Sequence, residues 1–129
     1  MGGVDWWLGV WVLAHIISGE AGTCGLEGRV LVAQVHANRL DAGIVGGWYG
    51  SAPPTPRDLA VAMWGREWPA NGRRPTFLMS YQDLELERVQ RLTHGLEEVA
   101  RIDCARGTGL SAWAAPMKKP PGEGAVGGG

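Results

Sequence analysis

Apolar residues at helical spacing dominate the first third of the chain and predict two helices in succession. Over residues 4–18, apolar side chains recur every three or four positions and cover nearly the whole circumference, which is typical of a helix buried in a core. Over residues 26–40, one apolar stripe stands opposite a polar side that carries Gln34 and Asn38. We therefore expect the first helix to be central in the fold and the second to be amphipathic.

A short third helix is predicted by its start signal. Thr55 provides an N-cap, Pro56 occupies the first helical position, and the side chain of Asp58 can reach back to the cap. This helix is expected to end at Gly65. The Gly- and Pro-rich residues 41–55 that precede it are expected to be a loop.

The last third of the chain predicts one more helix and a hairpin. Residues 76–79 are expected to be extended and to lead, through a capping-box-like sequence, into a helix over 82–92. Residues 96–104 and 110–114 are expected to be two strands joined by the turn 105–109. The predicted fold class is therefore α+β and mostly helical, with a small antiparallel two-stranded sheet near the C-terminus.

Length and composition place these elements in one domain. A chain of 129 residues is large enough for a single core. We assign this domain to residues 1–115. Residues 116–129 lack apolar periodicity, are rich in Pro and Gly, and are expected to be a disordered tail.

The charge pattern and the first residues exclude several classes of partner. The chain has 12 Lys and Arg against 13 Asp and Glu, with no basic stripe, so no nucleic-acid partner is expected. The N-terminus has neither the basic region nor the cleavage site of a signal peptide, and the apolar run over 6–17 is too short to span a bilayer. We therefore expect synthesis in the cytoplasm and no membrane insertion, and a substrate outside the cell would require another component to deliver the protein.

Two cysteines, Cys24 and Cys104, lie far apart in the sequence. Without an export signal, two isolated thiols are more often reduced and buried than paired, so we expect reduced cysteines and keep one disulfide as the alternative. A metal site is not expected, because Cys24, His15 and His36 lack the short paired spacings of zinc ligands.

Glu20 is the first candidate for chemistry. Gly19 and Gly22 permit a bend, so Glu20 is expected at the end of the first helix or on the turn after it. General acid catalysis needs a carboxyl that stays protonated near neutral pH, and burial beside apolar walls favours that form. On the local pattern alone, a glutamate that ends a helix and faces solvent is the commoner case.

Other polar and aromatic side chains could line a glycan-binding cleft. Gln34 and Asn38 share a helix face, which either turns toward Glu20 or is a solvated surface; the sequence leaves both open. Trp48 and Tyr49 form an aromatic pair between glycines on a loop. Such a pair can stack on sugar rings, although packing over the core is the commoner role.

The strings Ile-Ser-Gly-Glu-Ala-Gly at 17–22, Glu-Gly at 27–28 and Val-Leu-Val-Ala-Gln-Val-His-Ala-Asn-Arg at 30–39 resemble a known signature. It is that of the cell-wall hydrolases related to bacterial spore cortex-lytic enzymes, and the resemblance covers residues 12–84. It implies a lysozyme-like fold and a catalytic acid at Glu20. It also implies that Asn38 and Arg39 hold the helix and the cleft in shape.

The same resemblance implies a function. We expect a peptidoglycan-cleaving glycosidase, either a muramidase or a lytic transglycosylase, that cuts the bond between N-acetylmuramic acid (MurNAc) and N-acetylglucosamine (GlcNAc) with Glu20 as general acid/base and with no cofactor or metal. Asp41 and Asp83 are candidates for a second carboxylate, so hydrolysis and transglycosylation both stay open. The residues expected near the glycan are Gln34, Asn38, Trp48, Tyr49, Phe77, Ser80 and Tyr81, and those expected to be structural are Arg39, Gly19 and Gly22.

Peptidoglycan glycan strands are thus the expected partner. The missing export signal suggests a phage-encoded lysin released by a partner such as a holin, or a part carried on a virion. The alternative is a non-catalytic glycan-binding or virion structural domain, in which Trp48, Tyr49 and Trp68 stack on sugars.

Overall fold

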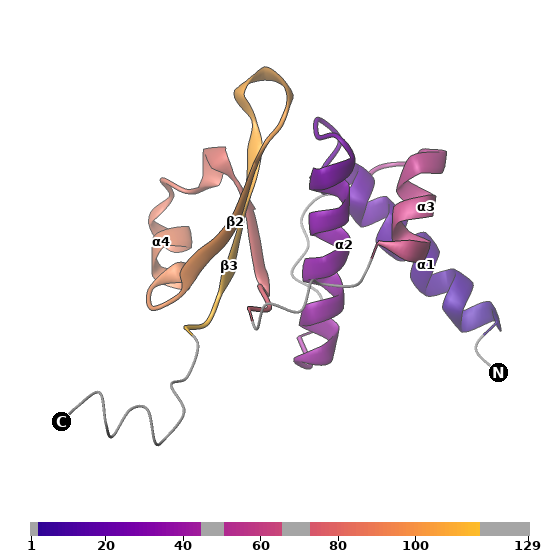
Figure 1. Ribbon diagram of the computed structural model, residues 1–129, viewed down its shortest axis with the longest axis horizontal. Helices are drawn as coiled ribbons and strands as arrows, with labels where there is room; N and C mark the ends of the chain where they lie inside the picture. Colours follow the sequence, from indigo (N-terminus) through magenta and orange to yellow (C-terminus); the bar gives the residue numbers. More distant parts are fainter. Residues whose placement is uncertain (1–2, 45–50, 66–72, 117–129) are drawn as a thin grey trace.

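The computed structural model describes residues 3–44, 51–65 and 73–116 and shows an α+β fold made of a helical layer and a small sheet (Figure 1). The helical layer contains α1 (Gly3–Glu20), α2 (Leu26–Asp41) and α3 (Pro56–Trp64), and the sheet contains β1 (Phe77–Ser80), β2 (Glu97–Asp103) and β3 (Gly109–Ala114). Between strands lie the 3-10 helix η1 (Tyr81–Asp83), α4 (Glu87–Thr93) and the 3-10 helix η2 (Ala105–Gly107).

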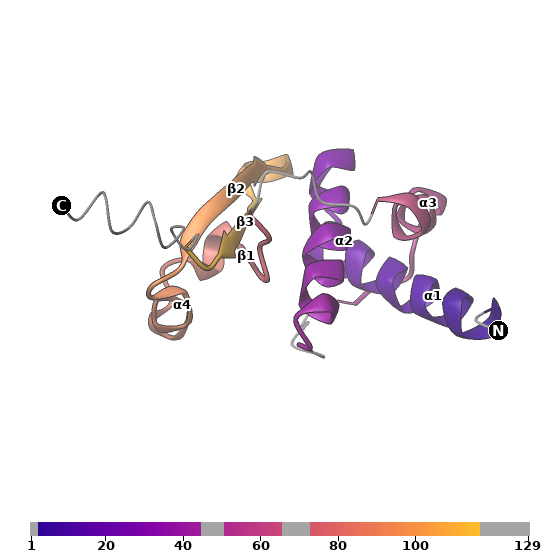
Figure 2. The ribbon, with the colours of Figure 1, turned by 60° about the horizontal axis from the view of Figure 1, so that its bottom comes forward.

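The second helix, α2, and not α1, lies between the other two helices of the layer and the sheet (Figure 2). It packs against α1 and α3 on one side and against β1 and β3 on the other. Its apolar residues Leu31, Val32 and Val35 are buried for this reason. The sequence-based expectation that the first helix is central is therefore wrong, because an all-apolar sequence does not determine which neighbours cover a helix.

The first helix is buried over only part of its length. Val10, Leu13 and Ile17 are fully buried, whereas Leu8 is 60% exposed and Trp11 is 50% exposed. Figure 2 shows the N-terminal half of α1 extending beyond the other helices. None of the helices in the described ranges is long and apolar enough to cross a membrane.

The capping box predicted for the third helix is confirmed. The backbone N–H of Asp58 donates to the Thr55 hydroxyl at 3.3 Å, and the Asp58 carboxylate accepts from the backbone N–H of Thr55 at 2.8 Å. Pro56 starts the helix and Gly65 caps its end, as the sequence predicts.

The sheet has three strands in the order β1-β3-β2, and both pairings are antiparallel. The predicted β2–β3 hairpin is confirmed, but the extended segment 76–79 adds a third strand, so the prediction of two strands is wrong. β3 is buried at nearly every position and is the central strand. A strand with no solvated face needs a hydrogen-bonded neighbour on each edge, which β1 supplies.

The helix predicted over 82–92 is also wrong in its first half. The chain instead forms η1 and a turn, and α4 begins only at Glu87. Ser80 makes no side-chain cap bond, and Tyr81 is held against the end of the sheet through its hydrogen bond to Asp103. This tertiary contact outweighs the local helix signal.

Two sequence-based predictions fall on residues that the structure does not describe. The Trp48–Tyr49 pair lies outside the described residues, and so does the predicted tail except for Pro116. The range 1–115 for the domain stays a prediction.

Candidate functional site

A cleft of about 150 Å³ lies where the end of α1 meets the end of the sheet. Among the described residues, it is lined on the helical side by Glu20, Thr23 and Cys24, and on the sheet side by Ser80, Tyr81, Gln82, Thr108, Gly109 and Leu110. The fold thus brings Glu20 together with two residues that the sequence predicted near a glycan, Ser80 and Tyr81, although they lie far apart along the chain.

Glu20 is the last residue of α1 and is partly buried. After it, the backbone turns tightly, with hydrogen bonds from Ala21 N–H to the Ile17 carbonyl at 2.8 Å and from Cys24 N–H to the Ala21 carbonyl at 2.9 Å. A Cβ atom at Gly22 would lie 2.8 Å from the Ser18 carbonyl oxygen. Only glycine therefore fits this close turn, which aims the chain from Glu20 toward the sheet.

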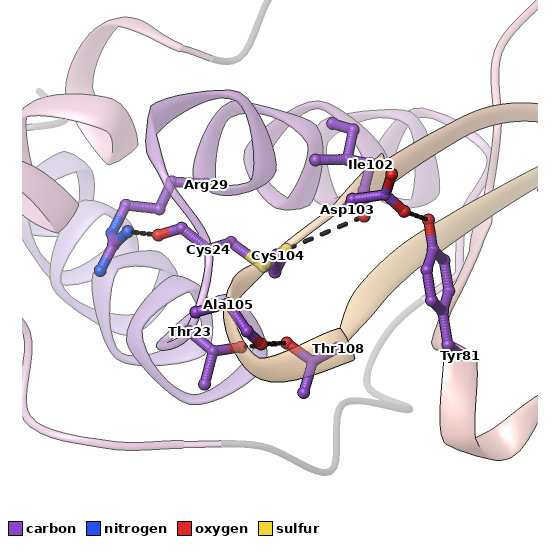
Figure 3. The surroundings of a disulfide bond; sticks show 9 residues. All are labelled: Thr23, Cys24, Arg29, Tyr81, Ile102, Asp103, Cys104, Ala105 and Thr108. Atoms are coloured by element: carbon purple, nitrogen blue, oxygen red, sulfur yellow. Dashed lines mark hydrogen bonds between the residues drawn. A yellow bond between two sulfur atoms is a disulfide. The ribbon is translucent and has the colours of Figure 1, made fainter.

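The wall of the cleft beside Glu20 is closed by a disulfide between Cys24 and Cys104, whose Cα atoms are 4.5 Å apart (Figure 3). The prediction of two reduced cysteines is therefore wrong. The fold packs the α1–α2 turn against the β2–β3 loop, and this contact pairs cysteines separated by 80 residues. Such proximity is invisible in the sequence, where only the number of cysteines and the absence of an export signal bear on pairing.

Two hydrogen bonds accompany the disulfide. The backbone N–H of Ala105 donates to the Thr23 carbonyl at 2.9 Å, and the hydroxyls of Thr23 and Thr108 are 2.9 Å apart. Figure 3 shows the contact between the two threonine hydroxyls close to the sulfur atoms. The turn that follows Glu20 is thus fastened to the hairpin loop at three points.

Tyr81 forms the opposite wall and is held by three contacts. Its ring lies so close to Gly109 that a Cβ atom there would overlap it, its hydroxyl donates to Asp103 at 2.6 Å, and the guanidinium carbon of Arg101 is 5.1 Å from its ring centroid. Partial burial, followed by the hydrogen bond to Asp103, raises the pKa of Tyr81 above its ordinary value. The Tyr81 hydroxyl therefore stays protonated and donates its hydrogen to Asp103. Its oxygen still has lone pairs that can accept a hydrogen bond from a ligand.

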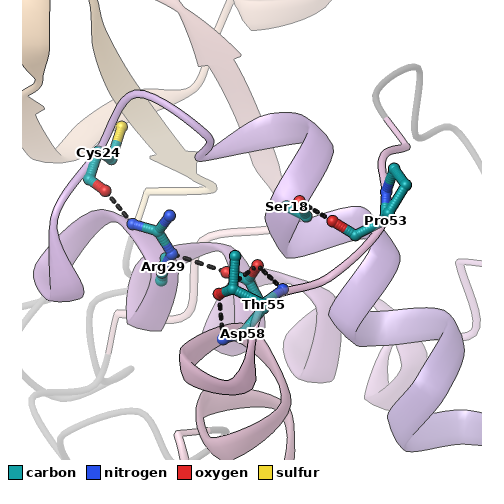
Figure 4. Close-up of polar contacts among 6 residues, drawn as sticks. All are labelled: Ser18, Cys24, Arg29, Pro53, Thr55 and Asp58. Atoms are coloured by element: carbon teal, nitrogen blue, oxygen red, sulfur yellow. Dashed lines mark hydrogen bonds and ion pairs between the residues drawn. The ribbon is translucent and has the colours of Figure 1, made fainter.

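A buried ion pair supports the same turn from behind (Figure 4). The guanidinium of Arg29 donates to the Asp58 carboxylate at 2.6 Å and to the carbonyl oxygen of Cys24. Burial by itself would raise the pKa of Asp58, but hydrogen bonds from the Thr55 backbone, from Arg29 and from the Thr55 hydroxyl outweigh it and hold that pKa below its ordinary value. Arg29 thereby connects α2, α3 and the α1–α2 turn.

Several predicted site residues lie elsewhere in the structure. Asn38 is buried and donates to the Pro75 carbonyl at 3.1 Å, and Arg39 donates to the Thr76 carbonyl at 2.8 Å. Both residues therefore hold the segment that enters β1 against α2. Neither they nor Gln34 is among the described residues that line the cleft.

Phe77 starts β1 opposite Trp113 and also does not line the cleft in the described part of the chain. Trp48, Tyr49 and Trp68 lie outside the described residues. Gly19 is exposed in the last turn of α1.

Neither of the two proposed second carboxylates is among the described residues that line this cleft. Asp41 is exposed and pairs with Arg74 at 3.4 Å near the end of α2, and Asp83 lies in η1. Of the described residues that line the cleft, Glu20 is the single one with a carboxylate. Within the described ranges, no three His, Cys, Asp or Glu residues form a cluster that could hold a metal ion.

The sequence does not predict six of the described lining residues, namely Thr23, Cys24, Gln82, Thr108, Gly109 and Leu110. The sequence predicts Gly109 as the last residue of a hairpin turn, but it begins β3, where the missing side chain makes room for the Tyr81 ring. A glycine inside a strand pattern is a recognised signal for such a close approach. The group that approaches Gly109 is Tyr81, which directly follows β1. The sequence-based prediction does not place β1 in the sheet, so it does not identify this contact.

No protein-family model, curated protein or solved structure matches this chain. The geometry of the cleft and the residues around Glu20 are therefore the features that bear on function.

Proposed function

We propose that this protein is a glycosidase that cleaves peptidoglycan at the bond between MurNAc and GlcNAc, with Glu20 as general acid and base. One observation carries the proposal: partly buried Glu20 lines the same cleft as Ser80 and Tyr81, at the junction of the helices and the sheet. An acid at this kind of junction can approach a glycan strand from one side while polar groups hold the strand from the other.

In this reaction Glu20 takes part in two proton transfers. It first protonates the glycosidic oxygen while that bond breaks and the sugar ring develops oxocarbenium character. The resulting carboxylate then removes a proton from the attacking group, either a water molecule or the 6-hydroxyl of MurNAc itself. Attack by water gives a reducing end, and attack by the 6-hydroxyl gives a 1,6-anhydro end.

The lining of the cleft supports the second route. Retaining and inverting hydrolysis both use two carboxylates, whereas the anhydro route needs one. Glu20 is the single carboxylate among the described lining residues, and the nearby side chains of Thr23, Ser80, Gln82 and Thr108 are neutral. Hydroxyls and amides of this kind hydrogen-bond sugar hydroxyls and acetamido groups.

The disulfide also supports work on a cell wall. Disulfides form and persist in oxidising environments outside the cytoplasm. Peptidoglycan lies in such an environment, where the Cys24–Cys104 disulfide is expected to stay oxidised. Because Cys24 lines the cleft, the disulfide also holds the cleft wall in place there.

The test compares wild type with Glu20→Gln on purified peptidoglycan and weighs the released fragments by mass spectrometry. Loss of a general acid should lower the release rate by at least about a hundredfold. Glu87→Gln is the matched control, because Glu87 is an exposed glutamate in the first turn of α4 outside the cleft lining, and it should retain activity.

The mass of the products separates the two routes. Fragments lighter by one water than the hydrolytic products identify the anhydro route, and reducing ends identify hydrolysis. Equal release by wild type and Glu20→Gln contradicts the catalytic proposal. If both proteins then sediment with insoluble peptidoglycan, the non-catalytic glycan-binding alternative replaces it.

A further inference from the structure

The N-terminal half of α1 exposes a cluster of large apolar side chains to solvent, which we call the outer face of α1. It consists of five side chains that are between 48% and 82% exposed, namely Val4, Trp7, Leu8, Trp11 and Val12. They follow one stripe on the side of the helix opposite its buried residues. Four of them, Val4, Trp7, Leu8 and Trp11, line a shallow, open hollow of about 420 Å³.

This face is large enough for a specific contact. A half-exposed tryptophan leaves ~100 Å² open, and with the three aliphatic side chains the outer face presents about 500 Å². Two such faces would bury about 1,000 Å² together, where specific protein–protein interfaces begin. An interface of this size is expected to be weak, with a micromolar dissociation constant.

The charges of α1 argue against a lipid surface as the occupant. The helix contains no Lys or Arg, and its acidic residues are Asp5 and Glu20. Helices that lie on membranes carry Lys and Arg on their polar side, which attract anionic lipids. α1 lacks both a polar side and basic residues.

The spacing of the face matches a second copy of itself. Val4, Leu8, Trp11 and His15 recur at intervals of four, three and four residues, the spacing of a coiled-coil seam. If two such helices run antiparallel, each Leu8 faces the large ring of Trp11 on the other copy. In the same register, Val4 of each copy faces His15 of the other, so the seam has four facing pairs of positions.

We propose that the outer face of α1 is a dimer interface, on which two copies of this chain pair through antiparallel α1 helices. Glu20 is the last residue of α1, so it lies beyond the seam of residues 4–15 in both copies. By the rise of a helix, the two Glu20 residues would stand about 30 Å apart along the pair. The dimer could therefore engage two separate glycan segments.

The test measures the association state of the full chain by analytical ultracentrifugation, from micromolar to millimolar protein. Wild type should form a dimer as concentration rises. Leu8→Glu should raise the dissociation constant by at least about a hundredfold, because it buries a carboxylate without a partner. Leu92→Glu is the matched control, since Leu92 on α4 is 58% exposed and Leu8 is 60% exposed, and this variant should dimerise like wild type.

A mixing experiment tests the antiparallel register. Trp11→Lys alone should be monomeric, but mixed with Leu8→Glu it should form a heterodimer, because the new lysine faces the new glutamate. Circular dichroism should show that both variants keep the fold, as expected for substitutions at exposed positions.

Three results would overturn the proposal. They are a wild type that stays monomeric to millimolar concentration, a Leu8→Glu dimer as stable as that of wild type, and a mixture that fails to associate. Sedimentation of monomeric wild type with phosphatidylcholine or phosphatidylglycerol vesicles would assign the face to a lipid surface instead. None of these measurements depends on whether the protein cleaves peptidoglycan.

Discussion

The disulfide between Cys24 and Cys104 offers the most quantitative test of this fold. It connects the helical layer to the hairpin and closes a loop of 80 residues. In the chain-entropy account, cross-linking a loop of this length restricts the unfolded chain and stabilises the native state by about 4 kcal/mol. That is a large share of the total stability of a small domain, which is typically about 5–15 kcal/mol.

The perturbation is the double variant Cys24→Ser and Cys104→Ser, compared with oxidised wild type and with wild type in reductant. Guanidinium unfolding followed by tryptophan fluorescence should show a loss of about 4 kcal/mol in the free energy of unfolding. Thermal unfolding should show a decrease in Tm of about 15 °C, at ~4 °C per kcal/mol for a domain of this size.

Activity provides an independent readout of the same bond. Cys24 lines the cleft, and the turn that follows Glu20 is fastened to the hairpin loop by the disulfide and two hydrogen bonds. Well below Tm, where both forms are folded, the reduced protein should therefore cleave or bind glycan more weakly than the oxidised protein. Disulfides typically contribute about 2–4 kcal/mol. A difference in the free energy of unfolding below about 0.5 kcal/mol between the oxidised and reduced forms would therefore refute this account of the cross-link.

Further predictions follow from the contacts around the cleft. Asp58→Ala should lower the free energy of unfolding by about 3 kcal/mol, because it removes the helix cap and leaves the largely buried Arg29 without its carboxylate partner. Arg57→Ala, on the exposed side of α3, should change the free energy of unfolding little, and equal losses for the two variants in urea titrations would contradict the role of the pair. Because the folded-state pKa of Asp58 is lowered, its stabilisation should be present in full above the unfolded pKa of about 3.9 and lost as pH falls through the folded value, so Asp58→Asn should flatten the acid limb of stability against pH. Gly109→Ala should displace the Tyr81 ring and lower the free energy of unfolding by about 1–3 kcal/mol. It should also raise the KM for glycan more than it lowers kcat, and an unchanged KM would show that Tyr81 does not bind the substrate.

Local sequence was sufficient for the elements whose signals are local. The capping box at Thr55 and Asp58 fixed where α3 starts, because both partners of each hydrogen bond lie within four residues. The placement of Glu20 at the end of α1 was predicted in the same way, from apolar periodicity followed by glycines. Two of the expected glycan residues, Ser80 and Tyr81, do line the cleft with Glu20.

Contacts between distant segments decided the rest. Residues 77–80 form β1 because they pair with the edge of β3 that β2 leaves open. Tyr81 lies outside the predicted helix because its ring packs on Gly109 and its hydroxyl donates to Asp103. The cysteines are paired because a turn and a hairpin loop 80 residues apart meet in the fold. Apolar periodicity predicted α1 itself, but only its neighbours determined that one half is core and the other half is exposed, since burial is a property of the packed molecule and not of a segment.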